Sequence, residues 1–219
     1  MIKKKSTKKY YFTVEGETEK WYLEWLKGEI NKCEKAEYNV SFDIRIEKNP
    51  LKRAKSLTVT GKTEIWHLSD YESDELIHVK QFNETMDNMK AASNIGKQIT
   101  YKFGYTNLTF DLWIILHKMD CKGFVTHRKN YIRYINKAFD EHFENMDEFK
   151  HEDNFKRCLK KLNLESVIIA VSRGENIMNR NVENGCRLYE YKGYKYYKEN
   201  PSMAIHEIIR KIIKECALI

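Results

Sequence analysis

The sequence predicts an α/β fold: a mostly parallel sheet flanked by helices, with a helical C-terminal extension. In the first 120 residues, apolar runs of strand length alternate with segments of helical periodicity, an order typical of parallel sheets. Beyond residue 120 the apolar spacing is helical. Two of the predicted strands also end in acidic side chains. Because parallel strands bind ligands beyond their carboxyl ends, we expect these acids to meet at one edge of the sheet.

The elements of the first half follow from their apolar spacing. Residues 9–14 are mostly apolar and predict a strand that ends before Gly16. Residues 17–31 repeat apolar side chains at helical intervals and predict an amphipathic helix. Residues 38–47 alternate apolar and polar side chains, which predicts a half-buried strand that Pro50 ends. The other elements expected here are a short helix over 51–57, a strand over 64–69, a helix over 75–90, a strand over 98–103 and a buried helix over 110–117.

Helical periodicity covers most of the second half. The predicted helices span residues 130–143, 154–162, 165–178 and 202–216. We therefore divide the chain into an α/β core over 1–120 and a helical extension over 121–219, packed together as one compact unit. Two prolines and nine glycines leave no room for a long flexible linker between them.

Composition narrows the class of protein. A hydrophobic fraction of 42% and an aromatic fraction of 13% argue against disorder. No stretch of about 18 apolar residues occurs, and the basic N-terminus lacks the apolar core of a signal peptide, so we expect a cytoplasmic protein without membrane contact. The five cysteines include no CxxC pair, which argues against a zinc site. The net charge of +7 favours a polyanionic partner, although many basic proteins have none.

Carboxylates at the two strand ends predict a divalent-metal site. Glu15 follows the first apolar run, and Asp70 and Glu72 follow the run over 64–69, with Asp74 just beyond. Acids two residues apart on an extended strand end point the same way, so Asp70 and Glu72 are expected to flank one cation. Oxygen ligands of this kind suit Mg²⁺ or Mn²⁺. The alternatives are a turn acid favoured by the following helix for Glu15 and an acidic surface loop for the second cluster.

Three motifs add a family resemblance to this pattern. Residues 12–20 read FTVEGETEK, residues 107–117 read NLTFDLWIILH, and residues 200–202 read NPS, with His206 shortly after. The acid pattern resembles the Toprim fold of topoisomerases, primases and several nucleases. The three motifs more closely resemble the VEGxTEK, NPxFExWLLLH and NPST…VH segments of the RloB-like family of bacterial phage-defence proteins. That family includes the Toprim partner in AbiL-type abortive-infection pairs.

The resemblance implies a function and roles for the acids. It implies a Toprim-like core that acts as a Mg²⁺-dependent endonuclease on RNA, with tRNA a candidate, or on DNA. The protein would be the effector of an anti-phage abortive-infection system, with an ATPase as its partner. Asp70 would be the principal Mg²⁺ ligand, Glu72 a second ligand, and Glu15 an acid/base or a further metal ligand. The family's usual DxD pair reads Asp70-Tyr71-Glu72 here, which lengthens the second acid by one methylene.

Three residues within these motifs are accessory candidates for the same site, beside Asp74. Asp111 lies near the start of the buried helix, where the helix dipole alone explains an acid. His117 and His206 are candidates for a catalytic role. A histidine at the end of an apolar helix is, however, more often a hydrogen-bonded core or capping residue.

A tyrosine- and lysine-rich stretch near the C-terminus is a candidate nucleic-acid surface. Residues 187–198 interleave aromatic and basic side chains, which suits base stacking combined with phosphate contacts. A tyrosine-rich hairpin packed on the helices, with its lysines in solvent, explains the pattern equally well. Two arginines on or beyond a predicted helix are candidate phosphate clamps. The candidate residues are Arg173, Arg180, Arg187, Tyr191, Lys192, Tyr194 and Lys195.

Two other functions stay open from the sequence. A non-catalytic interaction or sensor module would carry a degenerate Toprim site, marked by the Asp-x-Glu variant. A primase-like nucleotidyl-transfer enzyme would use the same acids, since Toprim folds also serve primases. The sequence leaves the oligomeric state undetermined.

Overall fold

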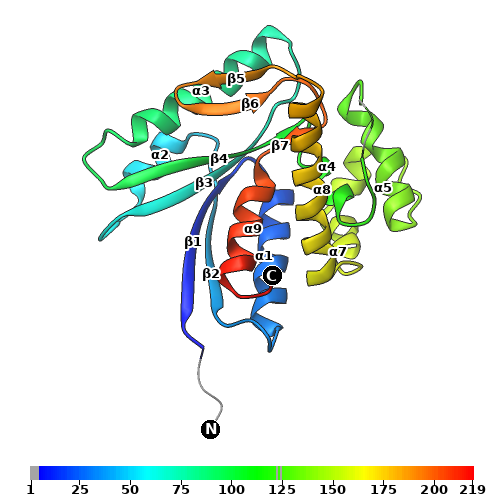
Figure 1. Cartoon of the computed structure of the whole chain (residues 1–219), viewed down its shortest axis with the longest axis horizontal. Helices are drawn as coiled ribbons and strands as arrows, with labels where there is room; N and C mark the ends of the chain where they lie inside the picture. The colour runs from blue at the N-terminus through cyan, green and yellow to red at the C-terminus, as the bar shows by residue number, and fades with distance from the viewer. Residues whose placement is uncertain (1–4, 122, 124) are drawn as a thin grey trace.

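A central sheet of five strands organises the molecule (Figure 1). The computed structural model describes residues 5–121, 123 and 125–219. The strand order is β2-β1-β3-β4-β7; the first four strands are parallel, and β7 runs antiparallel to β4. The strands are β1 (Thr7–Val14), β2 (Asn39–Ile46), β3 (Thr63–Asp70), β4 (Ile99–Asn107) and β7 (Ser202–Met203). The predicted α/β fold with a mostly parallel sheet is confirmed.

The register of the parallel strands aligns the ends of β1, β3 and β4. Val14 pairs with Leu68, and Asp70 at the end of β3 pairs with Thr106 on β4. Because these strands run in the same direction, their carboxyl ends lie at one edge of the sheet. The residue that follows β1 therefore lies beside the last residues of β3.

Helices cover both faces of the sheet (Figure 1): α1 and α9 on one face, α2 and α3 on the other. Successive strand residues point to opposite faces. Phe12 and Leu68 enter the hydrophobic core under α1 and α9, whereas Ile65 and Tyr101 enter a second core under α3. These helices are α1 (Glu17–Lys32), α2 (Pro50–Ser56), α3 (Leu76–Ala92) and α9 (Ile205–Glu215).

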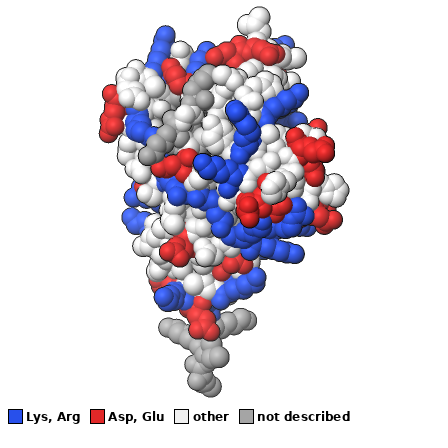
Figure 2. Space-filling model, turned by 90° about the vertical axis from the view of Figure 1, so that its right-hand side faces the viewer, with Lys and Arg blue, Asp and Glu red and all other residues white. Residues whose placement is uncertain are grey.

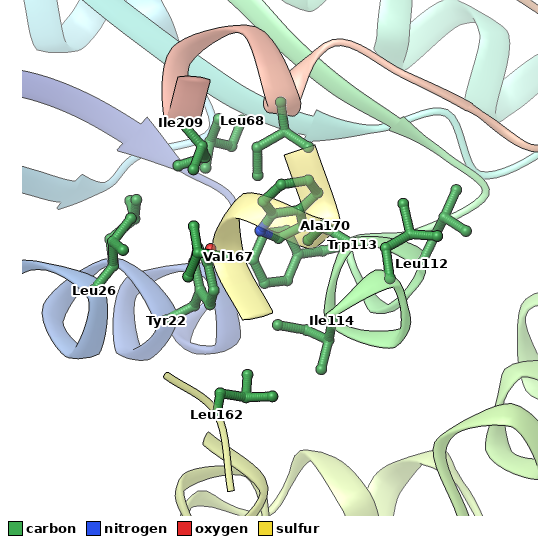
Figure 3. Packing of buried hydrophobic residues seen from close by; sticks show 14 of the residues in the cluster. Tyr22, Leu26, Leu68, Leu112, Trp113, Ile114, Leu162, Val167, Ala170 and Ile209 are labelled. Carbon is green, nitrogen blue, oxygen red and sulfur yellow. The ribbon is translucent and has the colours of Figure 1, made fainter. Parts of the chain in front are cut away.

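The remaining helices lie beyond α1 and α9, on the right of Figure 1. They are α4 (Asp111–Leu116), α5 (Tyr131–Phe139), α6 (Met146–Lys150), α7 (Glu152–Leu159) and α8 (Leu164–Glu183). Every residue of α4 is buried, as the apolar run over 110–117 predicted. The ring of Trp113 on α4 lies edge-on to Tyr22 of α1, 6.2 Å between centroids, and Val167 of α8 belongs to the same cluster (Figure 3). In the described part of the chain, no helix combines the length and apolarity needed to span a bilayer.

The second half contains strands that its helical periodicity did not predict. A hairpin of β5 (Leu188–Tyr191) and β6 (Tyr194–Tyr197) follows α8. Its two-residue turn is Lys192-Gly193, both with positive φ, where hairpins usually carry Asn-Gly. Because Lys192 stands where asparagine is usual, the sequence lacks the dipeptide that normally indicates a two-residue hairpin turn. Helix α6 also escaped prediction, because five residues are too few to establish a helical period.

The C-terminal segment returns to the sheet before its last helix. β7 pairs with Thr106 and Asn107 of β4, so the helix predicted over 202–216 begins only at Ile205. The side-chain amide of Asn107 donates to three consecutive carbonyl oxygens, most closely to that of Lys198 at 2.7 Å. The carboxyl end of β4 is therefore anchored by the chain that leads into β7.

Gly174 sets the spacing between α8 and the start of α9, and an alanine there is expected to destabilise the protein. A Cβ at this position would lie 2.9 Å from the Cβ of His206. This overlap outweighs the gain of up to about 1 kcal/mol that alanine brings to a helix interior. We expect Gly174→Ala to lower the free energy of unfolding by about 1 kcal/mol net, as measured by urea denaturation.

Gly28→Ala is the matched control for this substitution. Gly28 also lies within a helix, α1, but a Cβ there meets no other atom within 4 Å. Only the higher helix propensity of alanine acts at this position, so the free energy of unfolding of the variant should rise by up to about 1 kcal/mol. If both alanines stabilised the protein equally, α8 and α9 would have to move apart without cost.

Candidate active site

Glu15 and Asp70 meet at the carboxyl edge of the sheet. Glu15 follows β1, and Asp70 is the last residue of β3. The Ser69 hydroxyl donates to Oε1 of Glu15 at 2.8 Å, and the Thr106 hydroxyl donates to Oδ1 of Asp70 at 2.7 Å. Each acid is thus oriented by a hydroxyl from a neighbouring strand. One oxygen of each carboxylate is held, so the direction of the other is fixed.

A third carboxylate, Glu19, joins them from the first turn of α1. Its side chain is buried, with 7% of the residue exposed, and accepts a hydrogen bond from the Thr18 hydroxyl at 3.1 Å. Gly16 leaves the space for it: a Cβ at Gly16 would lie 3.2 Å from Oε2 of Glu19. The glycine before α1 therefore has a role in the site, because a larger residue would press on this carboxylate.

Asp111 and Lys150 complete the cluster from the helical layer. Asp111, the first residue of α4, is 1% exposed, and its Oδ2 lies 3.0 Å from Nζ of Lys150 at the end of α6. The Thr109 hydroxyl donates to the same oxygen at 2.7 Å. Oδ1 of Asp111 is buried and receives no hydrogen bond from the described residues. Such an atom is costly to bury and marks a place for a cation or a water.

Three carboxylates of this cluster, Asp70, Glu15 and Glu19, bind protons more tightly than isolated ones. Burial, followed by the repulsion of Glu19 and Glu15, holds the pKa of Asp70 well above its usual range. Burial also raises the pKa of Glu15 and of Glu19. Lys150 counters part of this: burial alone would lower its pKa, but Asp111 and Asp70 outweigh that and raise it. Several carboxylates thus share one ammonium group, a charge balance that favours an added cation.

Glu72 lies at the same cleft but is held by other partners. Its Oε2 accepts from the Arg128 guanidinium at 2.9 Å and lies 3.4 Å from Nε2 of His78. Asp74 is farther out: its carboxylate accepts from the Tyr71 hydroxyl at 2.5 Å and is largely exposed. Asp70 and Glu72 thus line the same cleft, but Glu72 contacts Arg128 and His78, whereas Asp70 accepts from Thr106.

A cleft opens over Glu15 and Asp70. Its volume is about 330 Å³, and Ser69, Glu72 and Lys48 also line it. Lys48 lowers the pKa of Glu15, although less than burial raises it. The cleft is therefore acidic at its floor, with a single lysine among these lining residues.

The donor set fits a divalent ion bound through oxygen. Among the described residues, no group of three acidic, histidine or cysteine side chains is placed so that it could hold a metal ion as it stands. The chemistry nonetheless suits Mg²⁺ or Mn²⁺: carboxylates with raised pKa values, and a buried Asp111 oxygen without a donor. Glu15, Glu19 and Asp70 are the residues that would hold such an ion, with Asp111 beside them.

The two candidate histidines are core residues in this structure. His117 lies between the carbonyl of Trp113, 2.9 Å from Nδ1, and the hydroxyl of Tyr22, 3.1 Å from Nε2. Burial lowers the pKa of His117 and of His206 to about 4, so both stay neutral at physiological pH. His206 contacts Gly174 and lacks a partner for Nδ1 among the described residues. The contacts of His117 connect α1 to α4.

The candidate phosphate clamps donate to backbone carbonyls. Arg173 donates to the carbonyl of Leu116 at 2.7 Å, and Arg180 donates to the carbonyl of Asn176 at 3.2 Å. Lys and Arg side chains, interleaved with acidic ones, extend across the face that carries α5 and α7 (Figure 2). That face is mixed in sign rather than uniformly basic.

The tyrosine-rich stretch forms the β5–β6 hairpin, which packs on α3 and β4. The Tyr191 hydroxyl donates to Asp87 of α3 at 3.2 Å, and Nζ of Lys192 lies 3.2 Å from the same carboxylate. Tyr194 packs edge-on against Phe103 of β4. The last two candidates stay near the surface: the Arg187 guanidinium lies 4.9 Å from the Tyr189 ring, and Lys195 lies 4.0 Å from Glu190.

Two members of the cluster, Glu19 and Lys150, were not identified from the sequence. The sequence does indicate that Glu19 is buried. It shares the helical face of Tyr22, Leu23 and Leu26, so the same periodicity predicts burial for all four residues. A buried acid on an apolar helix face needs a partner. Nothing in the sequence indicates a role for Lys150, because its helix is short and only the tertiary fold brings it to Asp111.

A comparison with protein families found one match. The family model described as RloB-like protein matches residues 10–212, which is nearly the whole chain. Searches of curated proteins and of solved structures returned no match.

Proposed function

Because the chain belongs to the RloB-like family, we propose that it is a Mg²⁺-dependent endonuclease of the Toprim type, acting on RNA as an effector of anti-phage defence. The observation that carries the proposal is the cluster of Glu15, Glu19 and Asp70, whose pKa values are all raised. Such a cluster gains stability when it binds a divalent cation. The resemblance to abortive-infection pairs favours RNA over DNA and an ATPase partner.

The residues of the site have separable roles in phosphodiester hydrolysis. A bound Mg²⁺ would stabilise charge on the scissile phosphate and lower the pKa of an attacking water. Asp70 and Glu19 would be the principal ligands, because their burial holds them in place. Glu15, with a raised pKa and one oxygen fixed by Ser69, is suited to accept a proton from the attacking water. Lys150 supplies an ammonium group beside the ligands and limits their mutual repulsion.

A second candidate function is a non-catalytic module that binds without cleaving. Two contacts favour it: Glu72 is paired with Arg128, and Lys150 already supplies a positive charge to the cluster. In that case the acids would have a structural role, with Lys150 as their permanent counter-ion. The two functions differ in whether substitution of the acids abolishes the effect in cells.

Growth arrest on induced expression tests the proposal. Wild type and the Glu15→Gln/Asp70→Asn double variant are expressed with and without a co-expressed neighbouring ATPase, and cellular RNA ends are sequenced. We expect arrest with discrete new RNA ends for wild type only. Arrest or phage protection retained by the double variant, with RNA intact, would support the binding module.

Glu72→Gln is expected to slow cleavage by about tenfold, much less than loss of a direct metal ligand. In this structure Glu72 contacts Arg128 and His78 rather than the acid cluster. Single-turnover cleavage of a labelled RNA measures the effect, with Asp74→Asn as the control that should leave the rate unchanged. A Glu72→Gln variant as inactive as Asp70→Asn would mean that Glu72 leaves Arg128 and binds the metal.

A further inference from the structure

A second cavity adjoins the acidic cluster on the side of Asp111 and Lys150. Its volume is about 540 Å³, within the range of small-molecule sites. Ile132 of α5 and Met146 of α6 line it, and Arg128 and Lys129 lie at its basic end. Helix α5 belongs to the side of the molecule that faces the viewer in Figure 2. Of its lining residues, the function proposed above uses only those shared with the acid cluster, Asp111 and Lys150.

We propose that this cavity binds one nucleotide of the substrate strand, next to the nucleotide that is cleaved. Its base would lie against Ile132 and Met146, and its phosphate would contact Arg128 and Lys129. The inference rests on the proposed nuclease function, because it takes a polynucleotide as the ligand. It adds a base-binding site, and therefore a source of sequence preference, to a site otherwise built to handle phosphate.

The apolar side chains distinguish this cavity from a simple anion site. Ile132 and Met146 are partly buried and pack on the main hydrophobic core, so they form a fixed surface. A nucleobase presents a flat π-face that such a surface can cover, and methionine adapts its shape readily. A free phosphate would gain nothing from these contacts.

The basic end of the cavity connects it to the catalytic cleft. Arg128, at the start of the short 3-10 helix η1 (Arg128–Asn130), lines the cavity while its guanidinium contacts Glu72, which lines the cleft. Lys150 lines the cavity and contacts the acid cluster through Asp111. A strand whose phosphate lies in the cleft would therefore pass Arg128 to reach the cavity. A phosphate oxygen pair suits a guanidinium, and the exposed contact with Glu72 is easily exchanged for it.

Polar groups at the cavity rim can recognise the edge of a base. Glu144, Asn145 and Asp147 line this rim. Oδ1 of Asn145 accepts from the backbone N–H of Glu148 at 2.9 Å, which fixes the orientation of its amide. The carboxylates of Glu144 and Asp147 accept hydrogen bonds, so they favour bases with exocyclic amino groups. We therefore expect guanine, cytosine or adenine to bind more tightly than uracil.

Nucleotide binding without metal tests the cavity separately from catalysis. The four ribonucleoside 5′-monophosphates, their nucleosides and inorganic phosphate are titrated into the full-length protein in EDTA by calorimetry. We expect the amino-bearing nucleotides to bind, and Ile132→Trp, which fills the cavity, to weaken them by about tenfold or more. The matched control is Arg133→Gln, the next residue of α5 but not a lining residue, which should bind as wild type does. Phosphate binding as tight as nucleotide binding, or unchanged affinity in Ile132→Trp, would overturn the proposal.

Photo-crosslinking of the wild-type protein tests the cavity without relying on the folding of a variant. A single-stranded RNA carrying 6-thioguanosine, which keeps the exocyclic 2-amino group, is bound in EDTA and irradiated. The crosslinked peptides are then identified by mass spectrometry. Crosslinks to residues 128–150 support the cavity; crosslinks confined to the β5–β6 hairpin contradict it. Nucleotide binding here with no cleavage under any metal would leave the cavity standing while the proposed nuclease fails. Cleavage with no binding in the cavity would leave the nuclease standing and overturn the base-binding site.

Discussion

Asp70→Asn is expected to slow metal-dependent RNA cleavage by about three orders of magnitude, equivalent to about 4 kcal/mol of lost transition-state stabilisation. The asparagine keeps the size of the side chain and its hydrogen bond from Thr106 but cannot bind Mg²⁺ as a carboxylate does. Single-turnover cleavage over a range of Mg²⁺ concentrations measures the change. We expect so large an effect because Asp70 is close enough to both Glu15 and Glu19 to experience the charge of each.

The same variant is expected to be more stable than wild type, which separates loss of chemistry from loss of fold. The pKa of Asp70 is higher in the folded protein than in the unfolded chain. Wild type therefore loses stability as the pH rises from the unfolded pKa, near 4, through the folded value. Asparagine does not titrate, so the gain should be close to zero at pH 4 and grow as the pH rises towards neutrality. Urea unfolding at several pH values without metal measures it; a destabilised variant would mean that Asp70 is held by favourable contacts.

Glu84→Gln is the control for both measurements. Glu84 lines the same cleft, but it lies on α3, where its carboxylate pairs with Lys80. Neither cleavage nor the pH dependence of stability should change. A comparable loss of cleavage in Glu84→Gln would show that the charge of the whole cleft matters, rather than ligation by the cluster.

Lys150→Met is expected to lower the free energy of unfolding by about 2 kcal/mol at neutral pH without metal. The substitution removes the ammonium group that contacts Asp111 and leaves that carboxylate buried with only the Thr109 hydroxyl. The figure is below the usual cost of breaking a buried pair, because the lysine side chain is 36% exposed. Thermal unfolding with and without Mg²⁺ measures it. Mg²⁺ should raise the melting temperature of the variant more than that of wild type, since the ion would replace the missing charge.

Two further variants make this test specific. Asp111→Asn in the Lys150→Met background should recover part of the lost stability, because Asp111 then carries no charge, whereas Asp70 and Glu19 still lack the nearby ammonium group. Lys156→Met removes an exposed lysine that pairs with Glu152 on α7 and should change little. If Lys150→Met were no less stable than Lys156→Met, water would have to reach Asp111 easily.

The sequence predicted those parts of the molecule that depend on local periodicity. The alternation on β2 and the apolar run that becomes α4 needed no knowledge of the fold, because the residues of one element carry the whole signal. The approach of Glu15 to Asp70 followed from a general rule about parallel strands. The resemblance of three motifs to one family was confirmed over residues 10–212.

The parts that the sequence did not predict depend on contacts between distant residues. Lys150 acquires its role from Asp111, 39 positions earlier in the chain, and from no pattern around it. Glu72 was grouped with Asp70 by its spacing and by the family's DxD pair, and both acids line one cleft; its contact with Arg128, 56 positions later, was not predicted. Charge patterns show which side chains are present at a strand end. They do not show which of them a distant helix or loop will contact.

The pairing of β7 with β4 couples the site to the order in which the chain is made. Thr106, which orients Asp70, lies on the stretch of β4 that pairs with β7. Helices α4 to α8 lie between these two strands in the sequence, so β4 is synthesised well before its partner strand. The sheet edge that supports Asp70 can therefore be completed only after the helical layer has been made. For the nuclease proposed above, this order of synthesis would delay activity until the helices that surround the site are present.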